Sequence, residues 1–339
     1  MTTRDAVRRM WAGDAGPAGR LAQALLLPVE GVFRVVTAAR REAYDRGILP
    51  SVRGRIPVIS VGNLSVGGTG KTPVASWVIR ALEEMGERPA LVARGYGRDE
   101  ILLHRRWTPG VPVIADPDRR AGVDEAARRG ATVAVLDDGF QHRRLRRRLD
   151  LVLVDAEEGL PGALLPRGPF RESRRALDRA GGIIVTRKGG TPRAAEGLAE
   201  TLAREYPDRP LARLHLSPGD FRRLGGPEGS ELGPGTPVLV ATGVARPETV
   251  ADAVRSLGRS VRETAAFPDH HEFTAADVRA LLQSAGDDPI VVTEKDAVKL
   301  AELADARGAD VWVIRQTLVW ESGEDRIRGL LRDAVGPEA

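Results

Sequence analysis

The sequence predicts an α/β fold in which a mostly parallel sheet is covered by helices on both faces. Short apolar runs of strand length alternate along the chain with segments of helical character, as expected when buried parallel strands are joined by helices. The alternation stops at residues 217–236, which are rich in Gly and Pro, and then resumes. At 339 residues the chain is long enough for two cores, so we expect a second, smaller α/β domain after a linker.

The composition limits the kinds of site that the chain can carry. There is no cysteine, which excludes a disulfide framework and a thiolate metal site and fits a reducing compartment. The net charge is +4, and because lysine occurs only four times, 47 of the 51 basic residues are arginine. A basic balance suits anionic partners, which include nucleic acid, phosphorylated substrates and an acidic membrane surface.

Residues 1–50 form an N-terminal segment with an apolar run at 21–36. Polar and helix-breaking residues interrupt this run, which makes it too short to span a bilayer. From residue 29 onward, apolar side chains recur at helical spacing, at Val29, Val32, Phe33 and Val36. Two interpretations are equally favoured: an amphipathic helix that lies on a membrane, and a helix that packs on the domain core.

A glycine-rich loop follows the first predicted strand, at residues 56–61, and precedes a helix predicted at 72–85. Strand, loop and Gly-Lys-Thr in this order indicate a phosphate-binding P-loop, and hence a P-loop NTPase-like sheet. Glycines let backbone N–H groups approach a polyphosphate, Lys71 would reach its β- and γ-phosphates, and Thr72 would ligate Mg²⁺. The usual motif has Gly where this chain has Ser65, and the alternative is a glycine-rich turn without a ligand. The candidate nucleotide-binding residues are Ser65, Val66, Gly67, Gly68, Thr69, Gly70, Lys71 and Thr72.

The rest of the first domain, at 51–216, supplies further strands and two acids. We expect strands at 88–93, 111–115, 131–136, 150–155 and 182–186, and helices at 124–129 and 173–179. Asp137 and Asp138 directly follow one of these strands, where a Walker-B carboxylate holds Mg²⁺ directly or through water. The alternative is a pair of acids that cap a loop. Arg143 or Arg144, in the basic run after them, is a candidate anion ligand.

The second domain is expected at 237–320, after the linker at 217–236 and before a C-terminal tail at 321–339. Its predicted strands are 237–241, 262–267, 289–293 and 311–314, and its predicted helices are 247–257, 275–284 and 297–304. Residues 267–272 place two histidines beside acids, which suits proton transfer better than metal binding, although surface histidines are equally compatible. Residues 293–296 match the Asn-Lys-x-Asp base-reading loop of GTPases only poorly.

Six blocks of sequence, in one order, resemble the tetraacyldisaccharide 4′-kinase family of lipid A biosynthesis. They are SVGNLSVGGTGKTP at 60–73, RGYGR at 94–98, DDGFQH at 137–142, LPRGPFRE at 165–172, FPDH at 267–270 and TEKD at 293–296. The resemblance implies Mg-ATP-dependent phosphorylation of the 4′-hydroxyl of a tetraacylated glucosamine disaccharide 1-phosphate. It also implies a peripheral protein on the cytoplasmic face of the bacterial inner membrane, with a membrane-associated N-terminal helix and no nucleic-acid partner.

The resemblance also implies roles for particular residues. Asp99 and His270 would activate the sugar hydroxyl, together with Lys71 at the phosphates. We expect Asp99 to come from the P-loop domain and His270 from the smaller one, so that the two meet only when the domains close. The family has a spacer before the acid that this chain lacks, but residues 102–106 still resemble the family sequence after its acid, so Asp99 is the matching residue. Further implied contacts with substrate or phosphate are His142, Arg171 and Glu172.

Two other functions fit the same motifs. The first is a P-loop kinase of a soluble metabolite, in which residues 21–41 are part of the core. The second is a non-enzymatic nucleotide switch on a membrane, for which an acid–histidine pair would be dispensable.

Overall fold

A computed structural model describes residues 3–95, 97–227, 229–244, 246–303, 306 and 309–337. The chain forms two compact units, and each is made of separate stretches of sequence. Unit 1 comprises Met1–Arg94, Asp116–Leu214 and Trp320–Ala339; unit 2 comprises Gly95–Ala115 and His215–Val319. This division differs from the predicted one: residues 95–115 belong to unit 2 instead of the 51–216 domain, and the predicted tail belongs to unit 1.

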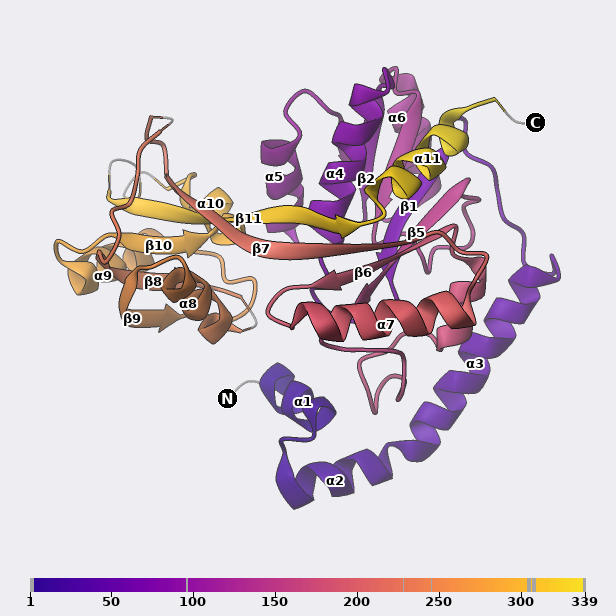
Figure 1. The fold of residues 1–339 in the computed structure, drawn as a ribbon, viewed down its shortest axis with the longest axis horizontal. Coiled ribbons are helices and arrows are strands. Elements are labelled where there is room, and N and C mark those ends of the chain that lie inside the picture. The colour runs from indigo at the N-terminus through magenta and orange to yellow at the C-terminus, as the bar shows by residue number, and fades with distance from the viewer. Residues whose placement is uncertain are drawn as a thin grey trace. The chain divides into compact units, whose positions relative to one another are not determined.

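Unit 1 is built on five parallel strands (Figure 1). Their order in the sheet is β2 (Pro89–Ala93), β4 (Val133–Asp137), β1 (Val58–Asn63), β5 (Leu149–Asp155) and β6 (Gly182–Arg187). Every residue of β1 is buried, as expected for a strand covered on both faces. The helices of this unit that follow or cover these strands are α4 (Lys71–Glu84), α6 (Arg119–Arg128), the 3₁₀ helix η1 (Arg174–Arg179), α7 (Pro192–Glu205) and α11 (Glu324–Val335). The predicted mostly parallel α/β architecture is confirmed.

Unit 2 contains four neighbouring strands and the helices that pack on them. The strands lie in the order β11 (Val311–Ser322), β10 (Ile290–Thr293), β8 (Pro237–Thr242) and β9 (Ser260–Ala266), and consecutive strands of this series are parallel. The remaining elements of the unit are β3 (Val113–Ala115), α5 (Arg98–Trp107), α8 (Pro247–Ser256), α9 (Ala275–Ala285) and α10 (Glu294–Leu300). Two apolar clusters form its core, one on each side of β8, since Leu239 and Ala241 belong to one cluster and Val238 and Val240 to the other.

The predicted linker at 217–236 is wrong in its first part. Residues 217–223 belong to β7 (Leu211–Arg223), which alternates between buried and half-buried positions from Leu211 onward. Ser217, Pro218 and Gly219 interrupt this pattern in the sequence, which is why the strand was missed. Both β7 and β11 run from one unit into the other, because the unit boundaries fall within these strands.

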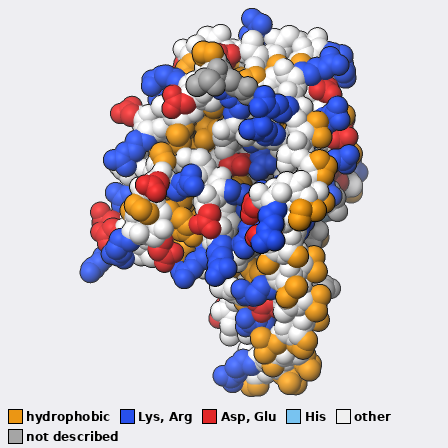
Figure 2. Space-filling view, turned by 90° about the vertical axis from the view of Figure 1, so that its right-hand side faces the viewer, with side chains coloured by type: hydrophobic (Ala, Val, Ile, Leu, Met, Phe, Trp, Pro, Cys, Tyr) orange, Lys and Arg blue, Asp and Glu red, His pale blue; other side chains and the backbone are white. Residues whose placement is uncertain are grey.

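Residues 3–45 form three consecutive helices, which we call the arm: α1 (Thr3–Ala12), α2 (Gly16–Leu25) and α3 (Leu27–Asp45). Figure 1 shows α2 and α3 (indigo) extending along the outside of unit 1. Their outer face is apolar, and its large side chains are between 52% and 70% exposed: Leu21, Leu25, Leu27, Val29, Val32, Val35 and Val36. Figure 2 shows apolar side chains gathered at the lower end of the molecule, over this arm.

The lengths of the arm helices decide whether any of them could span a membrane. Among the described residues, no single helix is long and apolar enough to cross a bilayer. By length and composition alone, α2 and α3 would qualify as a pair, although the chain bends by 48° between them.

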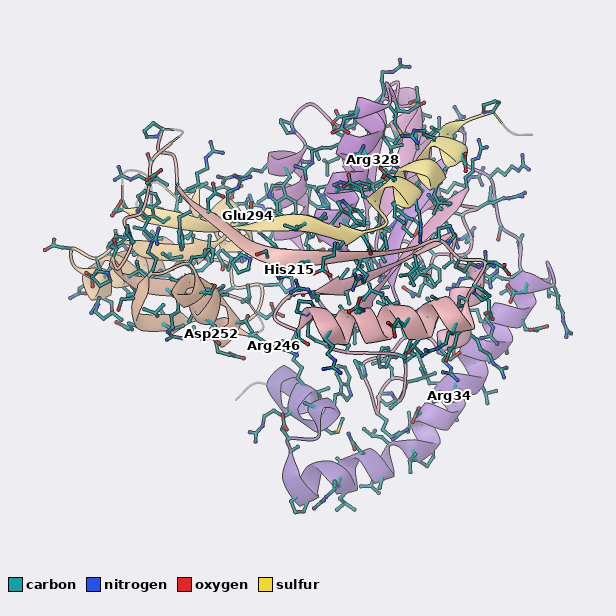
Figure 3. All side chains as sticks on the ribbon, in the orientation of Figure 1. Arg34, His215, Arg246, Asp252, Glu294 and Arg328 are labelled. Carbon is teal, nitrogen blue, oxygen red and sulfur yellow. The ribbon has the colours of Figure 1, made fainter. Side chains whose placement is uncertain are left out.

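The inner face of α3 is fixed to unit 1 by a buried carboxylate. Glu30 is only 3% exposed and accepts hydrogen bonds from Arg34 (2.7 Å), the Leu164 N–H (2.9 Å) and Arg167. Figure 3 shows Arg34 extending from α3. Burial alone would raise the pKa of Glu30, but the hydrogen bonds from Arg167, Leu164 and Arg34 lower it to about 2. The ionised carboxylate therefore holds the arm against the 164–167 loop.

We expect Glu30→Gln to loosen the arm by about 1–3 kcal/mol, because two guanidinium groups lose a charged acceptor. Since the folded pKa lies below the ordinary value of 4.5, the ion pair stabilises fully above pH 4.5, and this stability is lost as the pH falls toward about 2. Hydrogen exchange of the α3 amides at pH 7 measures the change. Glu42→Gln is the matched control, because the ion pair of Glu42 with Arg46, the C-cap residue of α3, lies at the surface. Equal exchange rates in the wild type and Glu30→Gln would contradict this assignment.

Candidate active site

The glycine-rich loop lies between β1 and α4, as the sequence predicts. A Cβ atom on Gly67 would lie 3.1 Å from Glu158 Oε1, so a larger residue there would crowd the loop. The loop is tied to the sheet at Thr69, whose hydroxyl accepts from Asn63 Nδ2 (2.8 Å) and whose carbonyl accepts from Thr186 Oγ1 (3.0 Å). The loop is therefore held rigidly beside the helix N-terminus, which suits the binding of a polyphosphate.

The remaining loop residues occupy distinct environments. Ser65 is buried and lies 3.3 Å from Asn63 Nδ2, whereas Val66 is exposed and its N–H donates to the Pro169 carbonyl (2.8 Å). Lys71 opens α4 and donates from Nζ to the Gly67 carbonyl (3.1 Å), and Thr72 follows it in the first turn. The lysine thus curls back over the loop, at the position where phosphate oxygens would compete for its ammonium group.

Asp137 and Asp138 end β4 beside this loop. Asp137 is buried, whereas the side chain of Asp138 is 41% exposed and its φ is 55°. Both Asp138 oxygens accept from Arg171, at 2.7 and 3.0 Å, and Lys71 Nζ lies 3.9 Å away. Burial raises the pKa of Asp138, but the hydrogen bond from Arg171 and the charge of Lys71 outweigh burial and lower it. The structure therefore brings together Lys71, Asp138 and Arg171.

The other two residues of the predicted phosphate group, Glu172 and His142, lie in different environments. Glu172 accepts from Arg179 (2.7 Å) and from Gln141 Nε2 (3.1 Å). His142 is half-buried, and burial, with the charges of Arg119 and Arg147, lowers its pKa, so it is neutral at pH 7. Glu172 therefore helps to order the loop after β4.

One arginine of the basic run has a structural role instead of the predicted anion contact. Arg143 donates to Asp45 (2.7 Å) and to the Arg41 carbonyl (3.1 Å), and its guanidinium lies over the Tyr44 ring. It therefore secures the end of α3 to unit 1.

Sequence reasoning missed two polar residues in the same place. Asn63 is fully buried, and its Oδ1 accepts from Arg171 while its Nδ2 reaches the loop hydroxyls. Gln141 donates to the Asn63 carbonyl (2.8 Å) as well as to Glu172. Both residues lie inside the six sequence blocks quoted above. The signal that could have identified Asn63 is its position as a polar residue at the end of the buried strand β1.

Asp99 and His270 contact each other within unit 2. Asp99 lies in the first turn of α5 and is buried, and its Oδ2 is 2.9 Å from His270 Nδ1. His270 adopts a left-handed backbone conformation, with φ 62°, that turns its ring toward the acid. The expectation that the two come from separate domains is wrong, because residues 95–115 pack with the second half of the chain. Tyr96, in the same sequence block, lies outside the described residues.

The pair is electrostatically coupled. Burial raises the pKa of Asp99, but the His270 hydrogen bond and the charges of Lys295, His270 and Lys299 lower it to about 2. The hydrogen bond that His270 Nδ1–H donates to Asp99 raises the pKa of His270 above its ordinary value of 6.5, against the effect of its burial. The carboxylate is therefore ionised at neutral pH and fixes the orientation of the imidazole, which is the arrangement of an oriented general base.

The described residues contain no group of three or more His, Cys, Asp or Glu side chains that could hold a metal ion by themselves. Mg²⁺ at a phosphate site takes one or two protein oxygens and completes its shell with substrate phosphates and water. The partly exposed carboxylate of Asp138, near the start of α4, fits such an ion.

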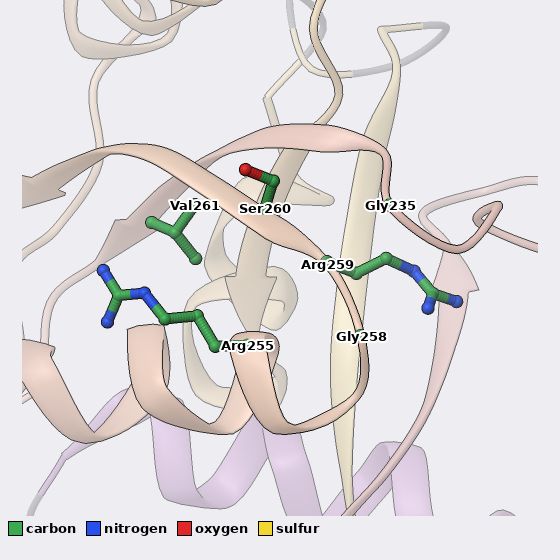
Figure 4. Close-up of a pocket in the computed structure, with 6 residues that line it drawn as sticks. All are labelled: Gly235, Arg255, Gly258, Arg259, Ser260 and Val261. Atoms are coloured by element: carbon green, nitrogen blue, oxygen red, sulfur yellow. The ribbon is translucent and has the colours of Figure 1, made fainter.

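A cavity of about 400 Å³ in unit 2 is not part of this site. It is lined by Gly235, Arg255, Gly258, Arg259, Ser260 and Val261 (Figure 4). The guanidinium of Arg259 donates to the Leu257 (2.6 Å) and Leu232 carbonyls and lies over the Phe221 ring. These contacts give the arginine a structural role.

Comparisons with known proteins agree with the sequence resemblance. Residues 22–335 match the family model described as tetraacyldisaccharide-1-P 4′-kinase. A tetraacyldisaccharide 4′-kinase of Anaeromyxobacter sp. (strain K) is 40% identical, covering 96% of this chain and 94% of that protein. A tetraacyldisaccharide 4′-kinase of Syntrophus aciditrophicus (strain SB) is 38% identical, covering 89% of this chain and 91% of that protein. The fold matches the crystal structure of "apo" form LpxK from Aquifex aeolicus in complex with ATP, with a TM-score of 0.74, 24% identity and coverage of 93% of this chain and all of that one. The chain therefore belongs to the tetraacyldisaccharide-1-P 4′-kinase family.

Proposed function

We propose that this kinase transfers the γ-phosphoryl group of ATP to the 4′-hydroxyl of a tetraacylated glucosamine disaccharide 1-phosphate. The observation that carries the proposal is the 2.9 Å contact between Asp99 and His270. A nucleotide switch has no use for an oriented base, whereas a kinase must remove the proton of a poorly nucleophilic hydroxyl.

The residues of unit 1 bind and orient the nucleotide. The backbone N–H groups of residues 67–72 hold the phosphates, and Lys71 leaves the Gly67 carbonyl to contact the β- and γ-phosphates. Thr72, with Asp138 or Asp137, would hold Mg²⁺, which would neutralise charge on the phosphates. Arg171 orients the Asp138 carboxylate through its two hydrogen bonds.

The residues of unit 2 handle the proton. His270 Nε2 accepts the proton of the 4′-hydroxyl, because Nδ1 faces Asp99. Asp99 keeps its negative charge throughout, since its pKa lies at about 2, and stabilises the imidazolium that forms.

Transfer of ³²P from [γ-³²P]ATP to a tetraacyldisaccharide 1-phosphate in mixed micelles tests the assignment. We expect phosphorylation at the 4′ position, and none with a disaccharide whose 4′-hydroxyl is replaced by hydrogen. Transfer to water-soluble sugars at a comparable kcat/KM would favour the soluble-metabolite alternative. Nucleotide binding without transfer would favour the switch.

The arm supports a peripheral position on the cytoplasmic face of the inner membrane, where ATP is present. Its outer face exposes seven large aliphatic side chains over two helices, and such a face is typical of helices that lie in a membrane interface. Phe33 lies on the other side, against the core of unit 1, so both interpretations of the sequence apply to different faces of one helix.

We expect Val32→Glu to weaken binding to anionic liposomes roughly 10-fold, because about 1.5 kcal/mol of apolar burial is lost. Co-sedimentation with vesicles measures the binding, and the melting temperature should not change, since Val32 is 66% exposed. Val319→Glu is the matched control, because it places the same charge at an exposed valine outside the arm. Unchanged vesicle binding in Val32→Glu would contradict the proposal that the outer face of the arm binds the membrane.

A further inference from the structure

The sequence block at residues 293–296 opens helix α10, and nothing in the proposed function uses it. Asp296 is fully buried, and its oxygens accept from Thr293 Oγ1 (2.7 Å), Thr242 Oγ1 (2.9 Å) and the Gly243 N–H (3.2 Å). Because both oxygens are engaged inside unit 2, this aspartate cannot read a nucleotide base. The partial likeness to the base-reading loop of GTPases therefore has another explanation.

Asp296 and Lys299 fix the turn that carries His270. Lys299 is buried, lies 3.6 Å from Asp296 Oδ1 and donates to the His271 carbonyl (2.7 Å). The Gly243 peptide, whose N–H is bonded to Asp296, accepts the His270 N–H at its carbonyl (3.0 Å). A Cβ on Gly243 would lie 3.2–3.3 Å from the 268–271 turn and from Asp296, so a side chain there would have to push these neighbours apart by a few tenths of an ångström.

The same helix contacts the element that carries Asp99. Glu294 (labelled in Figure 3) accepts from the indole N–H of Trp107 on α5 at 2.8 Å, and from the Gln316 N–H at 3.0 Å. Lys295 Nζ lies 3.3 Å from Glu100 Oε1, one residue after Asp99. One short helix therefore holds both segments that meet at the acid–histidine contact.

We propose that α10 is the positioning element of the proposed general base: Asp296 and Lys299 orient the His270 turn, and Glu294 and Lys295 orient α5. The positioning role in catalysis rests on the proposed function, whereas the positioning of His270 itself can be measured without turnover. A fully buried ion pair seldom gives more stability than apolar side chains of the same size. Its contribution here is the fixed position of two backbone segments.

The charged groups that face His270 are Asp99 on α5, Asp269 on its own turn and Lys295 on α10. The charge of Lys299 lowers the pKa of Asp99. A variant that changes charge on α10 would therefore shift the titration of His270 by electrostatics alone. The test needs a charge-neutral variant beside the charged one.

The experiment is an NMR titration of His270 in full-length protein, with His270→Gln to assign its signal. We expect Asp296→Asn and the charge-neutral Thr242→Val both to lower the pKa of His270 toward 6.5, because each loosens the contact that raises it. Asp288→Asn, which breaks a surface pair with Arg262 in the same unit, is the matched control and should leave the titration unchanged.

Kinetics supply a second measurement. We expect kcat to fall roughly 10- to 100-fold in Asp296→Asn, the cost of misplacing a reacting group, with KM for ATP unchanged. Lys299→Arg, which keeps a cationic donor for the His271 carbonyl, should retain more activity than Lys299→Met.

An unchanged His270 titration in folded Asp296→Asn or Thr242→Val, accompanied only by a lower melting temperature, would overturn the positioning role. A shift in Asp296→Asn without one in Thr242→Val would do the same, because electrostatics would then explain it. If His270→Gln kept full activity, the general base would be wrong, while the titration would still decide whether α10 positions the ring.

Discussion

Lys71→Ala is expected to lower kcat roughly 10²–10³-fold while changing the affinity for ATP much less. The ammonium group bonds to the Gly67 carbonyl in the free protein, so ground-state ATP binding must first displace that contact. Charge builds up on the phosphoryl oxygens during transfer, and these charged oxygens attract the ammonium group more strongly than the neutral Gly67 carbonyl does. The interaction is therefore realised mainly in the transition state.

Steady-state kinetics and equilibrium binding of a fluorescent ATP analogue separate the two quantities. Arg80→Ala removes the same charge from an exposed position further along α4 and serves as the matched control. A Lys71→Ala protein with near-normal turnover would show that the glycine-rich loop is not the phosphate site. A loss confined to KM would indicate that the lysine binds ATP and transition state equally well.

The parts of this molecule that depend on local sequence were predictable. The strand β1 is a short apolar run, the loop after it is marked by glycines and by Lys71, and Asp138 follows the next buried strand. Each of these signals lies within a few residues of the feature that it predicts. The helices α7 and α11 were missed because their charged residues outnumber the few apolar positions that they bury, such as Ile327 and Leu331 in α11.

The division into units was not predictable from neighbours along the chain. Residues 95–115 lie within the predicted first domain in sequence, yet α5 packs on α10, almost 200 residues later, through Trp107 and Glu294. The buried Glu30 in an otherwise exposed helix is a second example. In the sequence it interrupts an apolar run, and its distant donors, the Leu164 N–H and Arg167, explain its burial. Contacts of this kind depend on tertiary packing, for which a single sequence carries no periodic signal.

Asp99→Ala and His270→Ala are each expected to lower kcat by roughly 10²–10⁴-fold, the range for loss of a general base, with little change in ATP binding. The pH dependence should differ between wild type and Asp99→Asn. In the wild type, kcat rises with pH through the pKa of His270, which lies above 6.5, because only the neutral imidazole accepts a proton. Asp99→Asn replaces the charged acceptor that raises this pKa by a neutral amide oxygen, so the acidic limb should move to lower pH while the plateau falls.

Asp269→Asn provides the matched control for the acid. Its carboxylate lies 3.9 Å from His270 Nε2, compared with 2.9 Å for Asp99 at Nδ1, so it should change kcat far less. An activity near wild type in Asp99→Ala would instead transfer the role to Asp269 or Glu100.

The double variant Asp99→Ala/His270→Ala tests whether the two residues act as one unit. Asp99 does not touch the sugar hydroxyl in this scheme, and its effect passes through the orientation and charge of the imidazole. Once His270 is absent, Asp99 has nothing to orient, so the double variant should be scarcely slower than the slower single variant. Losses that multiply would mean that the acid and the histidine act independently, and the 2.9 Å contact would then be structural and not catalytic.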